Sequence, residues 1–305
     1  MDEESLRKAA FDWLREKDAL HNGELPWQLL TRGFTYNGIP ITFAGQKGIW
    51  KPRCFERIPL SIRTAFNGPY NDRPLDDMYL RYRYRGNDPD HHDNLGLREA
   101  YQTRTPLIYL LAIERGLYQA VWPVIVVHDN PDDLSCDVLV EPAYGLGTTE
   151  TEEIGIESLQ GESALSIRRY VIRKTWQRIH QTAFRARVVT AYGESCALCQ
   201  LKHRVLLDAA HIIADSDLHG EPIVPNGLCL CKIHHAAFDA NLIGVSPDFA
   251  VRVRPSVLEE TDGPMLQHGL KDLEGGRIIL PHRAQDRPDR ERLEVRFERF
   301  LKAAS

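Results

Sequence analysis

The chain has 305 residues, of which 43% are hydrophobic, enough for one large domain or two ordinary ones with packed cores. Its apolar runs are shorter than the roughly 18 residues that a membrane helix needs. The acidic start, Asp2-Glu3-Glu4, is the opposite of a secretory signal. We therefore expect a cytoplasmic protein with no membrane partner. The formal net charge of −5 argues at first against a nucleic-acid partner.

The first part of the chain is predicted to be mostly β-structure behind one helix. Leu6, Ala10 and Leu14 recur at helical spacing, and this pattern ends near residues 21–23. Asn37-Gly38 lies between two alternating apolar runs and predicts a β-hairpin over 34–43. Further short strands are predicted at 79–84, 107–113, 118–122 and 124–127, which favours a barrel-like domain. The sequence Asp90-His91-His92-Asp93 is interpreted as a solvated loop, because no supporting ligand spacing accompanies it.

Charge is segregated along the rest of the chain. Between residues 168 and 204 there are nine lysines and arginines against a single acid, Glu194, so a basic face exists locally despite the net charge. Acidic residues concentrate between 129 and 157. Residues 146–162 are acidic, contain several glycines and threonines and show no periodicity, which predicts a linker between a domain at 1–145 and a second at 163–305. Apolar spacing predicts a long helix over 172–186 and a closing helix over 293–301.

Two short motifs in the second domain have the spacing of a metal site. They are Cys196-x-x-Cys199 and Cys231-x-x-His234, and sulfur and nitrogen ligands in two such pairs favour a tetrahedral zinc ion. The alternative is that these cysteines are reduced and buried as small hydrophobic residues. That second role is expected for the cysteines outside the motifs, namely Cys54, Cys136 and Cys229.

The segment between and after these motifs resembles the HNH endonucleases. In that family a histidine at the end of a strand precedes a loop asparagine, and a further histidine lies on a helix beside the last zinc ligand. His211, Asn226 and His235 occur here in that order, within a core of residues 196–245. The resemblance implies a zinc-stabilised ββα-metal domain that hydrolyses DNA. It further implies that His211 is the general base, that Asn226 braces the loop and that His235 binds a catalytic divalent ion, Mg²⁺ or Mn²⁺, with Co²⁺ or Ni²⁺ as alternatives.

The carboxylate ligand of the catalytic ion is left open between two residues. Many relatives have a metal ligand directly before the base, but that position is Ala210 here. Asp208 would project to the same side of a strand as residue 210. Asp239 lies one helical turn beyond His235. Asp208 is slightly preferred, and the alternative for either aspartate is a hydrogen-bonding role that orients a ligand.

The first domain resembles the SRA domains, PUA-like barrels that hold a flipped 5-methylcytosine. The resemblance rests on residues 67–72, 79–86, 105–108 and 116–118, with Trp122. It implies that Tyr70 and Tyr84 stack on the extruded base and that Asp72 reads its amine, since a carboxylate that accepts from N4 distinguishes cytosine from thymine. The alternative is that tyrosines and arginines alternating on a strand form an ordinary amphipathic sheet face.

The sequence thus predicts an α+β protein with an N-terminal SRA/PUA-like barrel and flanking helices, followed by a zinc-stabilised HNH domain. The expected function is a type IV-like restriction endonuclease that cleaves double-stranded DNA bearing a modified cytosine. Two alternatives stay open, an HNH nuclease that acts irrespective of modification and a non-catalytic methyl-DNA binding protein. Because a single HNH hairpin cuts one strand, a homodimer would be needed for double-strand breaks.

Overall fold

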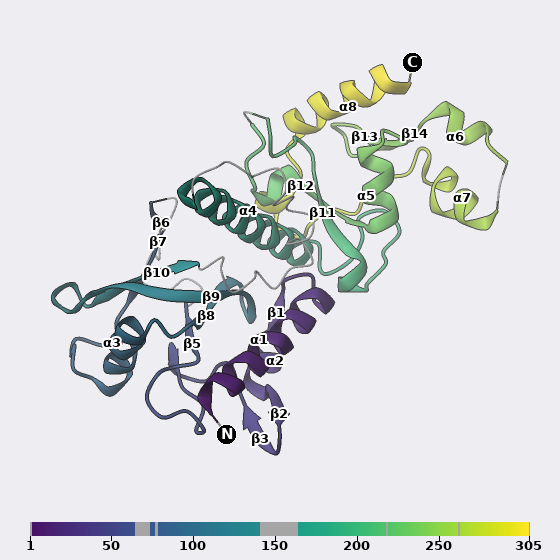
Figure 1. Ribbon diagram of the computed structural model, residues 1–305. Coiled ribbons are helices and arrows are strands. Elements are labelled where there is room, and N and C mark those ends of the chain that lie inside the picture. The colour runs from purple at the N-terminus through teal and green to yellow at the C-terminus, as the bar shows by residue number, and fades with distance from the viewer. Residues whose placement is uncertain are drawn as a thin grey trace. The chain divides into compact units, whose positions relative to one another are not determined.

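The computed structural model describes residues 2–64, 74–76, 79–140, 164–217, 219–261 and 263–304. The chain divides into two compact units, residues 1–182 and 183–305 (Figure 1). The boundary falls inside the long helix α4 (Ala164–Ala191), which contains the helix predicted at 172–186 and extends beyond it at both ends. The predicted linker at 146–162 lies outside the described residues, so that division of the chain stays a prediction.

The first unit is built on a sheet that curls into a half-barrel. Within the described residues the sheet has eight strands, in the order β4-β5-β8-β9-β10-β7-β6, with β1 paired to β9. The pairings are antiparallel except that between β5 and β8. The strands are β1 (Leu25–Pro26), β4 (Ile49–Trp50), β5 (Ser61–Arg63), β6 (Pro74–Asp76), β7 (Tyr79–Arg83), β8 (Leu107–Glu114), β9 (Leu117–Asn130) and β10 (Ser135–Val140).

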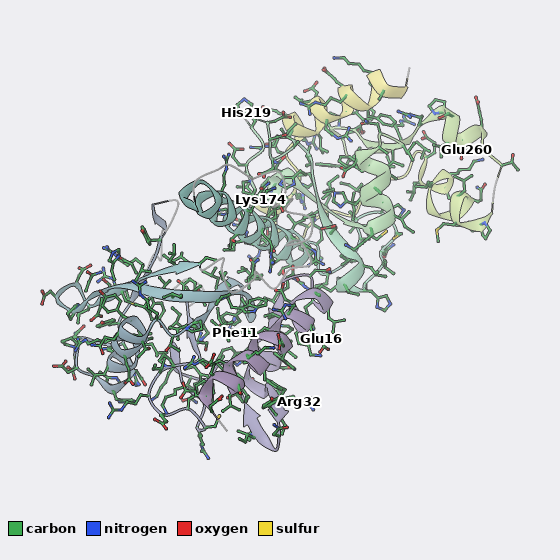
Figure 2. The ribbon with its side chains drawn as sticks, in the orientation of Figure 1. Phe11, Glu16, Arg32, Lys174, His219 and Glu260 are labelled. Carbon is green, nitrogen blue, oxygen red and sulfur yellow. The ribbon has the colours of Figure 1, made fainter. Side chains whose placement is uncertain are left out.

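Two local predictions for this unit are confirmed. The opening helix is α1 (Glu3–Leu20), and its apolar stripe is buried whereas Glu16 on the opposite face is exposed (Figure 2). The hairpin consists of β2 (Phe34–Tyr36) and β3 (Ile39–Ile41), joined by Asn37 and Gly38. Both turn residues have positive φ, 48° and 80°, as a two-residue hairpin turn of the I′ type requires.

One prediction for the sheet is wrong in detail. The two strands expected at 118–122 and 124–127 are one continuous strand, β9. The register between β8 and β9 shifts between Leu107 and Tyr109, where Trp122 and Pro123 together oppose a single residue. A bulge of this kind accepts a proline, which has no N–H to donate to the ladder. The proline therefore does not end the strand.

Each face of the sheet has its own core. Ile108 and Leu110 of β8 are fully buried in a cluster with Leu14 of α1. Tyr109, between them, points to the other face and packs in a cluster with Leu97 of α3 (His92–Thr103). Alternation along β8 thus places helices on both faces, and the short helix α2 (Trp27–Arg32) contributes to the first of these clusters.

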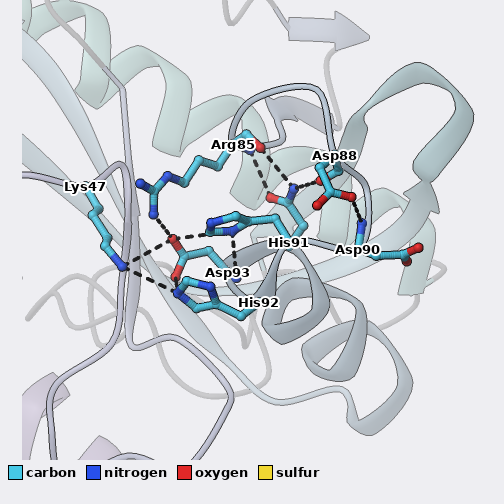
Figure 3. Close-up of polar contacts among 8 residues, drawn as sticks. Lys47, Arg85, Asp88, Asp90, His91, His92 and Asp93 are labelled. Carbon is cyan, nitrogen blue, oxygen red and sulfur yellow. Dashed lines mark hydrogen bonds and ion pairs between the residues drawn. The ribbon is translucent and has the colours of Figure 1, made fainter.

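The histidine-rich segment that the sequence predicts to be a loop is instead the start of α3. His91 is the N-cap residue and accepts a hydrogen bond from the backbone N–H of Asp93. Asp93 also forms ion pairs with Arg85 and Lys47, at 2.5 and 3.6 Å (Figure 3). His91, His92 and Asp93 are close enough to share a cation. The two basic side chains already neutralise the carboxylate, however, which favours a structural ion-pair cluster over a metal site.

The second unit contains two hairpins and a set of short helices around one core. The first hairpin pairs β11 (Leu207–His211) with β12 (Gly227–Cys231), and the second pairs β13 (Ile243–Val245) with β14 (Val251–Val253). The helices are α5 (Lys232–Asp239), α6 (Pro255–Glu259), α7 (Pro264–Gly269) and α8 (Arg290–Ala304), and the 3-10 turns are η5 (Arg204–Leu206), η6 (Val224–Asn226), η7 (Lys271–Leu273) and η8 (Ala284–Asp286).

The closing helix α8 packs closely on the second hairpin. Leu293 and Phe300 of this helix are buried, and the ring of Phe300 rests on the backbone of Gly244. A Cβ at Gly244 would lie 2.6 Å from that ring, so the position requires glycine. None of the helices in the described part of the chain combines the length and apolarity that a membrane crossing needs.

Candidate active site

The first hairpin and the helix that follows bring the candidate residues together. His211 is the last residue of β11 and lies opposite Gly227, while Asp208 lies opposite Leu230. The chain passes from Cys231 at the end of β12 directly into α5. The helix therefore starts beside β11, and its His235 lies within contact distance of Asp208, 3.3 Å between Nδ1 and Oδ2.

The imidazole of His211 is half-buried against an aromatic ring. Phe184 of α4 stacks on it, with ring centroids 4.1 Å apart and an interplanar angle of 23°. Burial lowers the pKa of His211 below 6.5, so the neutral form predominates at pH 7. Its Nε2 is buried and has no hydrogen-bond partner among the described residues. An unpaired buried polar atom costs about 1–3 kcal/mol, which water or a substrate in the site would recover.

Gly227 is what allows Phe184 to approach His211. A Cβ at this position would lie 2.6 Å from Val188 Cγ2 and 2.9 Å from Phe184 Cζ. Both side chains come from α4, which packs against the hairpin in the core of the second unit. The glycine that follows the loop asparagine therefore has a packing role in the site.

His235 lies between two carboxylates. Its Nδ1 is 3.3 Å from Asp208, and its Nε2 is 3.2 Å from Asp239, one helical turn further on. The hydrogen bond with Asp208 raises the pKa of His235. Burial opposes ionisation of Asp208, but His235, Lys232 and Arg185 together hold its pKa below 3.8. Asp208 is thus an ionised carboxylate with basic groups around it.

Asn226 fixes the loop between the two strands. Its side chain is fully buried. The side-chain oxygen accepts from the N–H of Ile213 at 2.9 Å, and the amide nitrogen donates to the carbonyls of Ile213 and Glu221, each at 3.0 Å. These three hydrogen bonds hold the chain directly after His211 against the start of β12.

A pocket of about 470 Å³ opens beside these residues. Its lining includes His211, His235 and Asp239, and within the described residues it does not include Asp208. Three charged side chains that the sequence analysis did not single out also line it, namely Asp215, Arg296 and Arg299. Asp215 follows the hairpin strand by four residues, but the arginines lie on α8, about sixty residues from the helix that carries His235, and no local motif marks them.

The predicted zinc ligands also lie together. The ligand atoms of Cys196, Cys199, Cys231 and His234 all lie within 4.8 Å of one another. The distance from Cys199 Sγ to Cys231 Sγ is 4.0 Å. Adjacent sulfurs around a tetrahedral zinc, each bound at 2.3 Å, would be about 3.8 Å apart. The site therefore has the composition and the spacing of a structural Cys₃His zinc centre.

A second contact of His234 fits the same interpretation. Nε2 lies 2.7 Å from the carbonyl oxygen of Gly269, at the end of α7. A carbonyl can only accept, so the proton is on Nε2, and Nδ1 remains free to bind the metal. Nδ1 is also the nitrogen that faces the sulfurs, 3.4 Å from Cys196 and 3.3 Å from Cys231.

The residues predicted to hold a modified base are less well placed by the structure. Tyr70 and Asp72 lie outside the described residues. Tyr84 is only 4% exposed and packs in a core cluster of the first unit. Its hydroxyl donates to Asp129, which also pairs with Arg98 at 3.1 Å. The Tyr84 ring is covered, so a base could stack on it only after a local rearrangement.

Comparisons with known proteins place the nuclease motif. A family model described as HNH endonuclease matches residues 196–246. No curated protein matches the sequence. Among solved structures, one described as "Modification dependent TagI restriction endonuclease" is similar at 16% identity, with 79% of this chain and 81% of that chain covered and a TM-score of 0.31. Residues 196–246 are thus an HNH endonuclease domain, which makes this chain an HNH-type nuclease.

Proposed function

We propose that this protein is a metal-dependent DNA endonuclease in which His211 is the general base. The observation that carries the proposal is that His211, His235 and Asp239 line one pocket. Hydrolysis of a phosphodiester needs a base for the attacking water and positive charge beside the phosphate. The pocket provides a neutral imidazole for the first need and a nitrogen and carboxylate pair for an ion that meets the second.

His211 is suited to accept a proton. Burial, to which the stacked ring of Phe184 contributes, lowers the pKa of His211 and so favours its neutral form. The hydrogen bonds of Asn226 to Ile213 fix the backbone beyond the histidine, and packing on α4 fixes the ring. A base held in this way is positioned before the substrate arrives, so little reorganisation is needed when water is activated.

His235 and Asp239 are the proposed ligands of the catalytic ion. The 3.2 Å between Nε2 and Oδ2 is close to the separation of about 3 Å expected between adjacent ligands that each lie at 2.0–2.1 Å from an octahedral ion. When bound, such an ion would stabilise charge on the phosphate and on the leaving oxygen. An imidazole ligand favours Mn²⁺, Co²⁺ or Ni²⁺ over Mg²⁺.

Asp208 takes a different role in this proposal from the one preferred on sequence grounds. Its carboxylate faces Nδ1 of His235, the nitrogen that points away from Asp239. By accepting a hydrogen bond from Nδ1–H it would leave Nε2 unprotonated, with its lone pair directed toward the ion. Asp208 is therefore a positioning residue, and Asp239 supplies the carboxylate ligand.

The test is nicking of supercoiled plasmid by the wild-type chain and by His211→Ala, with Mn²⁺ or Mg²⁺ added. A general base contributes a factor of about 10²–10⁴ to the reaction rate, so the nicking rate of the variant should fall by about that factor. His219→Ala is a matched control, because His219 is an exposed histidine of the same hairpin loop. Equal cleavage by wild type and His211→Ala would contradict the proposal.

We further propose that the first unit directs cleavage to DNA with a modified cytosine, by flipping the base. The support is chemical: Tyr70 and Asp72 supply an aromatic face and a carboxylate of the kind that an extruded cytosine requires. Plasmids that differ only in cytosine methylation, digested with Mg²⁺, Mn²⁺, Co²⁺ and Ni²⁺ in parallel, test this. Equal cleavage of both plasmids would show that the nuclease acts irrespective of modification. Binding of methylated DNA without any cleavage would show that the protein is a non-catalytic methyl-DNA binding protein.

A further inference from the structure

Helix α8 contributes two arginines to the nuclease pocket from outside the HNH motif. Arg296 and Arg299 are three residues apart, on the same face of the helix, and both line the pocket with His211 and His235. The matched family segment ends at residue 246, whereas α8 begins at residue 290. Packing of Phe300 on Gly244 fixes this helix against the HNH fold.

The two arginines are held very differently. Arg296 is 9% exposed. Its guanidinium lies over the ring of Phe238, 4.4 Å from the centroid, and donates to the carbonyl of Phe238 at 2.5 Å and to the side chain of Asn241. These contacts use both terminal nitrogens. Arg296 therefore mainly stabilises the packing of α8 against the end of α5.

Among the described residues, Arg299 has a single side-chain partner, Asp217. Its side chain is 50% exposed and forms an ion pair of 3.0 Å with Asp217, which is itself 40% exposed. A guanidinium has five N–H donors, and this ion pair uses one nitrogen. An exposed ion pair of this kind contributes at most about 1 kcal/mol, so it is readily exchanged for a stronger partner.

A DNA phosphate is the partner that this position fits. The substrate must bring a phosphodiester to the pocket that His211 and His235 line. The planar fork of arginine binds phosphate oxygens through two parallel, charge-assisted hydrogen bonds, which makes phosphate a stronger partner than a solvent-exposed carboxylate. Asp217 is also a negatively charged oxygen ligand, and it holds the guanidinium at the pocket edge.

We propose that Arg299 is a substrate-binding residue that exchanges its ion pair with Asp217 for a phosphate of the bound DNA. The inference rests on the proposed nuclease function of the same pocket. It assigns to α8 a part of the active site that the HNH motif does not contain. Until DNA binds, the ion pair with Asp217 holds the guanidinium of Arg299 at the edge of the pocket.

The test compares four variants of the full chain, with thermal unfolding measured for each. Arg299→Gln removes the charge, Arg299→Lys keeps the charge without the fork, and Asp217→Asn frees the arginine. Arg292→Gln is the matched control: Arg292 lies on the same helix and pairs with Glu221 of the same loop at 2.5 Å, but it does not line the pocket. His219, whose carbonyl also accepts from Arg292, is labelled in Figure 2.

Cleavage of linear duplex DNA in Mn²⁺ is the first readout. Arg299→Gln should reduce kcat/KM on the order of 10- to 100-fold, the loss expected for a charge-assisted hydrogen bond. Arg299→Lys should retain an intermediate activity, and Asp217→Asn should match or exceed the wild type. If the ion pair with Asp217 were only a structural tether, Asp217→Asn would lose as much activity as Arg299→Gln, and that result would overturn the inference.

DNA affinity at several salt concentrations is the second readout, measured in a His211→Ala background so that the DNA stays intact. Loss of one phosphate contact should reduce the slope of log K against log salt by about 0.9 for Arg299→Gln. The Arg292→Gln slope should be unchanged, and equal slopes for both variants would refute the contact. Failure of the nuclease proposal is distinguishable, because wild type and His211→Ala would then cleave equally.

Discussion

Loss of the zinc ion should unfold the second unit. Three of the four proposed ligands are buried in or beside its core, at 0% exposure for Cys196, 5% for Cys231 and 3% for His234. Through Gly269 the site also anchors α7. Structural zinc contributes about 10–16 kcal/mol of apparent binding free energy in zinc-finger peptides, and a typical domain is stable by only about 5–15 kcal/mol. A zinc ion bound here would therefore contribute an amount comparable with the whole stability of the unit.

The assay is calorimetric unfolding of the full chain together with its zinc content, for the wild type and for Cys199→Ser. The wild type should contain one zinc ion per chain, and chelation should abolish the transition of the second unit while that of the first remains. Cys199→Ser should behave like the chelated protein. Cys54→Ala, at a cysteine of the first unit, is the control and should keep the ion. A Cys199→Ser protein that binds zinc and unfolds at the wild-type temperature would show that Cys199 is not a ligand on which the fold depends.

Three further outcomes follow from the pocket geometry. Gly227→Ala should cost about 1–3 kcal/mol of stability and reduce cleavage, because its methyl group would displace Phe184 from His211; thermal unfolding and nicking rates check this, and an unchanged unfolding temperature would contradict it. The cleavage rate should rise with pH and reach a plateau, and the midpoint of the rise should lie below 6.5. The reason is that burial lowers the pKa of the His211 base and only its neutral form accepts the proton. A rate that falls with pH over this range would argue against that role. Asp239→Asn should raise the Mn²⁺ concentration needed for half-maximal cleavage more than Asp208→Asn does, whereas the reverse order would make Asp208 the ligand.

Elements governed by nearby residues could be predicted from the sequence. The Asn37-Gly38 turn needs positive φ at two adjacent positions, and these residues provide it at low cost. The motifs at 196–199 and 231–234 also lie together in space. In each motif the spacing of three residues lets both side chains reach one ion, so the site could be predicted from two short local patterns. In contrast, α3 was missed because its first turn is polar, and its helical character depends on burial of Leu97 and Ala100 against the sheet.

The parts of the site that depend on tertiary packing could not be predicted. The alternation of side chains along a strand predicts that Asp208 projects to the same side as residue 210. It does not predict that His235 directs Nδ1 to Asp208 and Nε2 to Asp239. Phe184 carries no motif, and it reaches His211 only because Gly227 lacks a Cβ. The contribution of α8 to the pocket is likewise set by packing between segments far apart in the chain.

Chemical rescue of a variant without the His211 side chain shows whether this imidazole is the general base. His211→Gly should be inactive and should leave a space beside Phe184 that a small base can enter. Added imidazole should restore Mn²⁺-dependent DNA nicking by His211→Gly in a saturable manner, and it should leave the rate of Asp239→Asn unchanged. If imidazole restored nothing while the variant still bound DNA and kept its zinc, or if His211→Gly cleaved at the wild-type rate, His211 would not be the general base.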